Sequence, residues 1–268
     1  MTALIEPLAS EPADVAIPRL IEEHGGLLYA LGLRFCGSED EAQDLVQDVF
    51  LLAWQNWGRF DGRSRAKTWL YTIAARACQR RHRKRAGEPE HMASLEELLP
   101  GPTGHVPDLQ SRQDDAFQEL VKRETREAVE RGISLLPFNF RIALVLKDFV
   151  ELPVADVAKI LDINPATVKT RCHRARLLLR RTLSERFLDQ PSPAARQSPQ
   201  LCFDLLQAKL DALDRGVEFS IADPDLCERC NAVFHQLDLT KEACSNLLKE
   251  TMPDKLLDAV RRAPAAIA

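Results

Sequence analysis

The residues with the clearest potential for chemistry lie near the end of this 268-residue chain. Cys227 and Cys230 form a Cys-x2-Cys pair, whose thiolates can share one soft or borderline metal ion. A zinc site needs about four ligands. The candidates for the remaining positions are Cys202, Asp223, His235 and Cys244. Three thiolates with a histidine or carboxylate favour zinc, whereas two or three thiolates alone favour copper(I).

The alternative is that these cysteines are small buried apolar residues and that His235 lies on a helix surface. Four of the seven cysteines lie in the last third of the chain with one close pair, which favours zinc or another thiophilic metal. The other three, Cys36, Cys78 and Cys172, lie on apolar faces, and we expect them in the core. No Gly-rich phosphate loop, nucleophile elbow or His-Glu hydrolase motif is present, so we do not expect an enzyme.

The N-terminus has no basic segment followed by an apolar one, and no apolar run is long enough to span a bilayer. We therefore expect a cytoplasmic protein without a membrane segment. In that compartment, cysteines are more often reduced or metal-bound than paired in structural disulfides.

The net charge of −4 hides a strong segregation of charge. Residues 59–85 carry ten Lys or Arg and one Asp, and residues 165–186 carry seven Lys or Arg and one Glu. Between them, residues 88–130 carry eleven acids and four bases. Two basic stretches with an acidic connector indicate two contacts on one polyanion, rather than two solvated helix faces.

Nearly every segment has helical periodicity, so the sequence predicts an all-α fold. Ser38 and Glu41 form a capping box at the start of one helix. Stretches rich in Pro, Gly and Ser divide the chain. The predicted parts are a first helical domain at 15–87, a linker at 88–111, a second helical domain at 112–187, and a helical cysteine-rich domain at 200–262.

The second domain contains a predicted helix-turn-helix. Its first helix carries the apolar face of residues 154–161. Asn164 is the expected N-cap of the second helix, with Pro165 in the first helical position. The residues expected to point inward are Val168, Cys172, Ala175 and Leu179. The residues expected to face outward and contact DNA are Thr167, Lys169, Thr170, Arg171, Arg174 and Arg176.

Longer motifs carry a family resemblance. "DEAQDLVQDVFLLAWQNWGRF" (40–60) and "TWLYTIAARACQRRHRKR" (68–85) resemble region 2 of a bacterial extracytoplasmic-function (ECF) sigma factor. Residues 136–181, "LPFNFRIALVLKDFVELPVADVAKILDINPATVKTRCHRARLLLRR", resemble region 4. The resemblance implies a dissociable RNA polymerase subunit without a catalytic centre, whose partners are core polymerase and promoter DNA. Region 2 would bind the clamp helices and open the −10 element, and region 4 would read the −35 element.

The same resemblance assigns residues in the first domain. The polymerase-binding residues would be Asp44, Gln47, Asp48 and Phe50. The DNA-binding residues would be Arg63, Arg65, Lys67, Trp69, Arg76, Arg80, Arg81 and Arg83. The arginines would hold phosphates, and Trp69 would support base stacking, although a tryptophan at such a position is more often part of the core. Arg63 and Arg65 stand where the family pattern usually has acidic or polar residues, which leaves the −10 preference open.

The tail is similar to a zinc-binding anti-sigma domain fused to its own sigma factor, with Asp223 where that pattern has a histidine. It also resembles the cysteine-rich extension of metal-responsive ECF sigma factors. An intramolecular contact between tail and sigma domains is expected. The tail would be a metal sensor, a structural zinc knot, a thiol redox switch or an inert extension, and would either inhibit or complete the sigma domains. The alternative function is a helix-turn-helix operator-binding regulator with a structural zinc tail.

Overall fold

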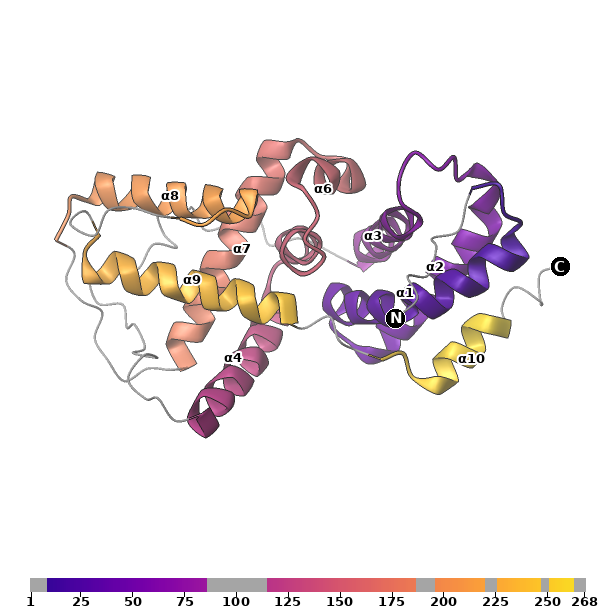
Figure 1. The fold of residues 1–268 in the computed structure, drawn as a ribbon, viewed down its shortest axis with the longest axis horizontal. Helices are drawn as coiled ribbons and strands as arrows, with labels where there is room; N and C mark the ends of the chain where they lie inside the picture. The colour runs from indigo at the N-terminus through magenta and orange to yellow at the C-terminus, as the bar shows by residue number, and fades with distance from the viewer. Residues whose placement is uncertain (1–8, 86–114, 187–195, 220–225, 247–250, 263–268) are drawn as a thin grey trace. The chain divides into compact units, whose positions relative to one another are not determined.

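The computed structural model describes residues 9–85, 115–186, 196–219, 226–246 and 251–262. Every regular element in these ranges is helical, which confirms the prediction of an all-α fold (Figure 1). None of the helices in these ranges is long and apolar enough to cross a membrane. The predicted linker and Asp223 lie outside the described residues.

The chain divides into two compact units. The first comprises Met1–Gly87, Ile160–Asp162 and Leu248–Ala268, and the second comprises Glu88–Lys159 and Ile163–Leu247. The predicted cysteine-rich domain is therefore not a unit of its own. Most of it packs within the second unit, and its last helix packs within the first. The reason is that the tail helices bury their apolar faces against helices that precede the tail in the sequence, and not only against one another.

The first unit is built on three long helices. These are α1 (Ala13–Cys36), α2 (Glu39–Asn56) and α3 (Ala66–Arg85), with a short 3-10 turn at Trp57–Arg59. Gly37 ends α1 in a left-handed conformation, with φ of 85°. Ser38 then caps α2, where its Oγ accepts a hydrogen bond from the Glu41 N–H at 3.4 Å. The predicted cap is confirmed.

Close contact between α1 and α2 depends on one glycine. A Cβ on Gly32 would lie 3.2 Å from the Cα and carbonyl oxygen of Ala42, which is tighter than ordinary packing. Small residues on both helices therefore let the two backbones approach. The helix α3 packs against both α1 and α2.

The second unit begins with α4 and contains the predicted helix-turn-helix. Its elements are α4 (Asp115–Leu135), α5 (Phe138–Leu144), a π-helical segment (Val145–Phe149), α6 (Val154–Leu161) apart from its last two residues, and α7 (Pro165–Arg186). The Ala166 N–H donates to Asn164 Oδ1 at 2.8 Å, so the predicted cap of α7 is confirmed. The four side chains expected to point inward from α7 are all buried.

Two tail helices, α8 (Pro199–Arg215) and α9 (Glu228–Asn246), complete this unit. In Figure 1 the orange α8 and the gold α9 run across the direction of the pink α7. One apolar cluster joins the three helices. It contains Leu177 of α7, Leu205, Leu206, Leu210 and Leu213 of α8, and Cys227, Cys230, Val233, Phe234 and Leu237 around and on α9. The last helix, α10 (Asp254–Arg262), contacts α1 and α2 in the first unit.

Candidate nucleic-acid interface

The first unit carries exposed basic side chains on α3 and on the loop before it. Arg63, Arg65, Arg76 and Arg80 are exposed. Within the loop, Asp61 accepts from the backbone N–H and the side chain of Arg63. These hydrogen bonds, the backbone one foremost, lower the pKa of Asp61. The side chain of Arg63 remains 89% exposed, and a phosphate can reach it. Lys67 is half-buried, and the side chain of Arg83 lies outside the described residues.

Arg81 joins two predicted sites inside the first unit. Its Nη2 lies 2.6 Å from Asp48 Oδ2, and its Nη1 lies 4.0 Å from Asp44 Oδ2. A residue expected to hold phosphate is therefore paired with two residues expected to bind polymerase. Asp44 and Gln47 are exposed. Phe50 is 2% exposed, so its expected direct contact with polymerase is corrected to a place in the core.

Trp69 belongs to an aromatic cluster at the start of α3. Its ring lies 5.7 Å from that of Trp57 and 5.3 Å from that of Phe60, measured between centroids. The Trp57 Nε1–H donates to the Glu11 carbonyl oxygen at 2.7 Å. Trp69 is only half-buried, so it is a supported aromatic surface rather than a closed core residue.

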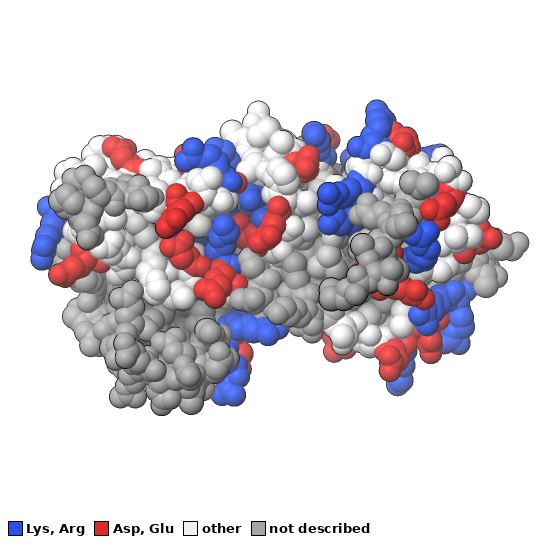
Figure 2. All heavy atoms as spheres, viewed as in Figure 1, with Lys and Arg blue, Asp and Glu red and all other residues white. Residues whose placement is uncertain are grey.

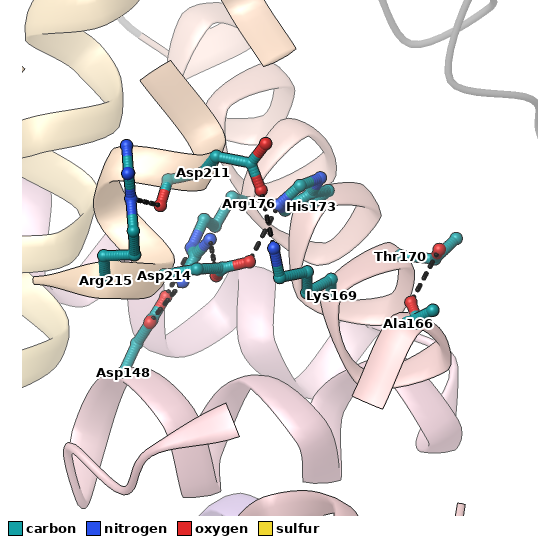
Figure 3. A network of polar contacts seen from close by, with 9 residues as sticks. All are labelled: Asp148, Ala166, Lys169, Thr170, His173, Arg176, Asp211, Asp214 and Arg215. Carbon is teal, nitrogen blue, oxygen red and sulfur yellow. Dashed lines mark hydrogen bonds and ion pairs between the residues drawn. The ribbon is translucent and has the colours of Figure 1, made fainter. Parts of the chain in front are cut away.

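On α7, one face meets two acids of the tail. Lys169, His173 and Arg176 lie at positions i, i+4 and i+7, which align on one side of a helix. Figure 3 shows this face turned toward α8, where Asp211 and Asp214 lie three residues apart. The contacts are short: Lys169 Nζ to Asp211 Oδ1 is 3.0 Å, His173 Nε2 to Asp214 Oδ2 is 2.9 Å, and Arg176 Nη1 to Asp214 Oδ1 is 2.7 Å.

Arg176 is the centre of this network and is 2% exposed. Two of its nitrogens bind Asp148, with Nε to Oδ2 at 2.8 Å and Nη2 to Oδ1 at 2.6 Å. The prediction that Arg176 faces outward is wrong, because its guanidinium lies between two buried carboxylates. Burial alone would lower the pKa of Arg176, but the charge of Asp148 outweighs it and raises the pKa.

Asp214 responds to the same network. Burial alone would raise its pKa, but the hydrogen bond from His173 and the charge of Arg176 outweigh burial. The net result is a pKa of Asp214 below its ordinary value. The carboxylate is therefore held ionised by two partners on α7, and α7 and α8 share one buried charge system.

Sequence reasoning missed four members of this network: Asp148, His173, Asp211 and Asp214. One signal was available. An acidic pair at spacing i, i+3 on one amphipathic helix matches basic positions i, i+4 and i+7 on another. Nothing in the sequence, however, says that these two helices are neighbours.

His173, Asp211 and Asp214 also bring three donor atoms within 4.8 Å of one another. Lys169 and Arg176 supply the opposite charge to the same two carboxylates, so ion pairing accounts for this cluster without a cation. Acidic and basic side chains are interleaved on the visible face of the described residues in Figure 2. Of the other predicted DNA-contacting residues on α7, Thr170 is exposed, and the half-buried ones are Thr167, Arg171 and Arg174.

A second site lies at the start of α9. The Asn231 N–H donates to the Cys227 carbonyl oxygen at 3.1 Å, so Cys227 is the N-cap of the helix. The Sγ atoms of Cys227 and Cys230 are 3.7 Å apart. Burial raises the pKa of Cys227, but backbone N–H groups, first that of Arg196 and then that of Cys230, outweigh it and lower the pKa. A thiolate at a helix N-terminus is stabilised in this way.

Cys202 on α8 reaches the same site. Burial, then the thiols of Cys227 and Cys202, raise the pKa of Cys230 to about 12. The structure therefore brings Cys227 and Cys230 together and places Cys202 in contact with Cys230. A tetrahedral metal with thiolate bonds of about 2.3 Å places its sulfurs about 3.8 Å apart, and the observed 3.7 Å between Cys227 and Cys230 fits this edge.

Two other predicted ligands do not join this site. Cys244 is fourteen residues beyond Cys230 on α9, a rise of about 21 Å along the helix. His235 is five residues beyond Cys230, which turns it about 140° around the axis. Cys230, His235 and Cys244 all lie on α9. The helix holds Cys244 far along its axis from Cys230 and turns His235 to another face. The prediction that His235 and Cys244 complete the metal site is therefore corrected.

The chain is similar to known proteins in both units. Residues 20–88 match the family Sigma-70 region 2, and residues 126–179 match Sigma-70, region 4. The ECF RNA polymerase sigma factor SigW of Bacillus subtilis is 32% identical over 172 residues, which is 63% of this chain and 90% of SigW. SigM of Mycobacterium tuberculosis is 32% identical over 168 residues, 63% of this chain and 77% of SigM. The solved sigma factor RpoE, in complex with the anti-sigma factor NepR from Bartonella quintana, is 23% identical with a TM-score of 0.43, over 62% of this chain and 94% of RpoE.

Proposed function

Because the chain belongs to the ECF family of RNA polymerase sigma factors, we propose that its helices α8 and α9 act as a brake on its own region 4. The chain directs transcription as a sigma factor, with region 2 in residues 20–88 and region 4 in residues 126–179. A simple operator-binding regulator would leave region 2 unexplained. The brake is an addition to the sigma function, encoded in the same chain.

The observation that carries this proposal is the pairing of Lys169 with Asp211. Lys169 lies in the first turns of α7, where a recognition helix contacts DNA. Its ammonium group is 3.0 Å from a carboxylate of the tail. A carboxylate at this distance occupies the position that a DNA phosphate would take. DNA therefore has to displace the acid before Lys169 can contribute to binding.

The apolar cluster, rather than the ion pair, keeps α8 and α9 packed on α7. Each fully buried Leu or Phe side chain contributes about 1.5–3 kcal/mol, and the cluster contains six leucines and one phenylalanine. Both partners of the Lys169–Asp211 pair are 44% exposed, and such pairs contribute about 0.2–1 kcal/mol. Removing Asp211 should thus free Lys169 without releasing the tail.

The test is binding of the full chain to a −35 duplex across a salt series. Asp211→Asn is expected to tighten binding by a factor of about 1.4 to 5, since the pair contributes about 0.2–1 kcal/mol. It should also steepen the slope of log affinity against log salt by about 0.9, the value of one added phosphate contact. The control is Glu218→Gln, which removes one exposed acid of the tail. If the two variants changed the DNA affinity equally, the change in net charge would explain the result. That outcome would contradict the proposal that α8 blocks Lys169.

We further propose that Cys202, Cys227 and Cys230 hold zinc or another thiophilic metal. The support is the spacing of Cys227 and Cys230 and the lowered pKa of Cys227, which favours the thiolate that binds metal. Such an ion would fasten α8 to the start of α9, because its ligands come from both. A bound metal would then stabilise the pair of helices that covers α7.

Metal content of the purified chain tests this second proposal. Cys227→Ser is expected to lose the metal, while Cys244→Ser should keep it, because α9 carries that residue about 21 Å away. Loss of metal from both variants would point to unfolding of the tail. Retention in both, or absence of metal from the unmodified chain after growth with zinc, would contradict the site.

For polymerase binding, we propose that Asp44, Gln47 and Asp48 form the contact. Asp44 and Gln47 are exposed on α2, and Asp48 is partly exposed beside Arg81. Asp44→Lys with Gln47→Lys should weaken capture of core polymerase at least about tenfold, because the two lysines reverse the charge that this surface presents to its partner. Gln55→Lys, on an exposed position of the same helix, is the control.

A further inference from the structure

Two cysteines of the first unit lie against each other, although they are far apart in the sequence. Cys36 is the last residue of α1, and Cys78 lies inside α3. Their Sγ atoms are 3.9 Å apart, and 42 positions separate the two residues in the chain. Both sulfurs are thiols rather than members of a disulfide. The sigma function gives this pair no role.

The two thiols differ in their access to solvent. Cys78 is 3% exposed, whereas Cys36 is half-buried at the end of its helix. The next residue, Gly37, is exposed. A small oxidant can therefore reach Cys36 directly, while Cys78 is within reach of Cys36 itself. An accessible thiol beside a second thiol that can resolve its oxidation product is typical of redox-reactive cysteines.

A cation lies beside the more accessible thiol. Arg81 is three residues beyond Cys78, on the same face of α3. Burial alone would lower the pKa of Arg81. Its contacts with Asp48, and then the charges of Asp44 and Cys36, outweigh burial and raise this pKa. The attraction is mutual, so Arg81 favours the thiolate of Cys36. It offsets the C-terminal end of α1, where the helix dipole disfavours negative charge.

The separation of the two sulfurs is compatible with a bond between them. A disulfide has an S–S length of about 2.05 Å, so the atoms have to approach by about 1.9 Å. Rotation of the Cys36 side chain and a small shift of the last turn of α1 can supply this movement, because helix ends fray. The helix α3 can keep its position.

We propose that Cys36 and Cys78 form a peroxide-reactive dithiol, which closes reversibly to a disulfide between α1 and α3. In the first step, the Cys36 thiolate attacks one oxygen of hydrogen peroxide, the O–O bond breaks, and hydroxide leaves a sulfenic acid on Cys36. In the second step, the Cys78 sulfur attacks the Cys36 sulfur and the S–O bond breaks. The departing hydroxide takes the Cys78 proton and becomes water. The two cysteines lose two electrons, and the peroxide gains them.

The inference goes beyond the sigma function and depends on neither the tail nor a metal. The disulfide would fasten α3, which carries the exposed Arg76 and Arg80, to the end of α1. It would also remove the thiolate beside Arg81. Region 2 would thus have an oxidant-responsive site of its own, separate from the cysteines of the tail.

Peptide mapping of the full chain tests the bond. The reduced, metal-free protein is exposed to hydrogen peroxide, the remaining thiols are blocked with N-ethylmaleimide in urea, and a tryptic digest is analysed without reduction. The expected product joins residues 35–59 to residues 77–80 and disappears after treatment with dithiothreitol. If both thiols still react with the maleimide, or if Cys36 is linked only to a second copy of the chain, the proposal is overturned.

Variants separate the roles of the two thiols. Cys78→Ala should stop at the sulfenic acid, which dimedone traps on Cys36, while Cys36→Ala should leave the buried Cys78 unoxidised. Cys244→Ser, a buried position of the second unit, is the control and should form the link at the unmodified rate. Equal dimedone labelling of Cys36 in Cys78→Ala and in the unmodified chain would contradict a resolving role for Cys78.

The role of Arg81 has its own measurement. Arg81→Gln should slow the loss of the Cys36 thiol about threefold or more, because a neighbouring cation raises the population of the thiolate that reacts. The unmodified chain and the Cys244→Ser control set the reference rate. An unchanged rate would contradict the role of Arg81 in activating Cys36.

Unfolding in urea gives a test that needs no variant. Tryptophan fluorescence follows the first unit, because all three tryptophans of the chain lie there. The disulfide restricts the unfolded chain between Cys36 and Cys78, so oxidation should move the fluorescence midpoint to higher urea, and dithiothreitol should reverse the shift. A midpoint that stays or falls after the bond has formed would show that closure strains the unit, against a pair poised to react.

Discussion

The two basic helices that we expect to bind DNA, α3 and α7, differ in what their basic side chains contact. On α3, Arg76 and Arg80 are exposed, and Arg81 pairs with acids of its own region. On α7, Lys169 and Arg176 bind acids from a tail helix. Basic composition therefore predicts where nucleic acid can bind, but not whether the surface is available. Availability depends on which acidic helix packs beside it.

The depth of burial is the second difference between these pairs. Arg81 keeps 27% of its side chain exposed and its partner Asp48 keeps 48%. Arg176 and its partners Asp148 and Asp214 keep 1% to 2%. Solvent screens the first pair and not the second, so similar distances carry very different consequences when one partner is removed.

The largest expected effect follows from that contrast. Arg176→Ala leaves two carboxylates buried without their cation and should destabilise the second unit by about 3–5 kcal/mol. Arg81→Ala should cost the first unit about 1 kcal/mol or less. All three tryptophans of the chain, Trp54, Trp57 and Trp69, lie in the first unit. Urea unfolding followed by tryptophan fluorescence thus reports the first unit, while far-UV circular dichroism reports both.

Arg176→Ala is expected to move the dichroism transition and leave the fluorescence transition in place. Arg81→Ala should shift fluorescence slightly. A fluorescence shift for Arg176→Ala as large as its dichroism shift would mean that the units unfold together. Equal costs for the two substitutions would contradict the distinction between buried and screened pairs.

Acid should weaken the second unit through Asp214. The folded pKa of this group lies below its unfolded value because His173 and Arg176 outweigh the effect of burial. Its contribution to stability is therefore complete above the unfolded pKa of about 3.9 and is lost as pH falls through the lower folded pKa. Dichroism-monitored unfolding between pH 5 and pH 2.5 measures it. Asp214→Asn should flatten this dependence, and Asp204→Asn, on an exposed position of α8, should not.

Each unit contains two cysteines whose sulfur atoms lie close together. Cys36 and Cys78 have Sγ atoms 3.9 Å apart, and Cys227 and Cys230 have theirs 3.7 Å apart. In the second pair, the pKa of Cys227 is lowered and that of Cys230 is raised to about 12. Iodoacetamide at pH 8 should alkylate Cys227 at least about tenfold faster than Cys230, because the thiolate is the nucleophile. Peptide mass spectrometry after short exposure checks the order, and metal-free protein is required.

Much of the fold was predictable because its signals are local. The capping residues Ser38 and Asn164 mark the starts of α2 and α7, and four buried positions of α7 follow from periodicity. The cysteine site was predictable in part, since Cys227 and Cys230 are close in sequence. Cys244 was misassigned because sequence spacing does not reveal that one unbroken helix runs from Cys230 to it.

What the sequence did not reveal are contacts between distant helices. Arg176 looks like an outward basic residue until Asp148 and Asp214, 28 and 38 residues away, are placed beside it. Phe50 lies in a motif associated with a partner, yet its side chain is in the core. Both errors have the same physical origin: helical periodicity assigns a residue to a face but does not say what covers that face.

The smallest expected effect compares the two caps. In region 2, the Glu41 N–H donates to Ser38 Oγ at 3.4 Å, and in region 4, the Ala166 N–H donates to Asn164 Oδ1 at 2.8 Å. Caps contribute about 0.5–2 kcal/mol, and a long bond belongs at the low end of that range. Asn164→Ala should therefore cost about 1 kcal/mol and Ser38→Ala about 0.5 kcal/mol. The same two optical probes measure both, and a larger loss at Ser38 would show that hydrogen-bond length does not rank these caps.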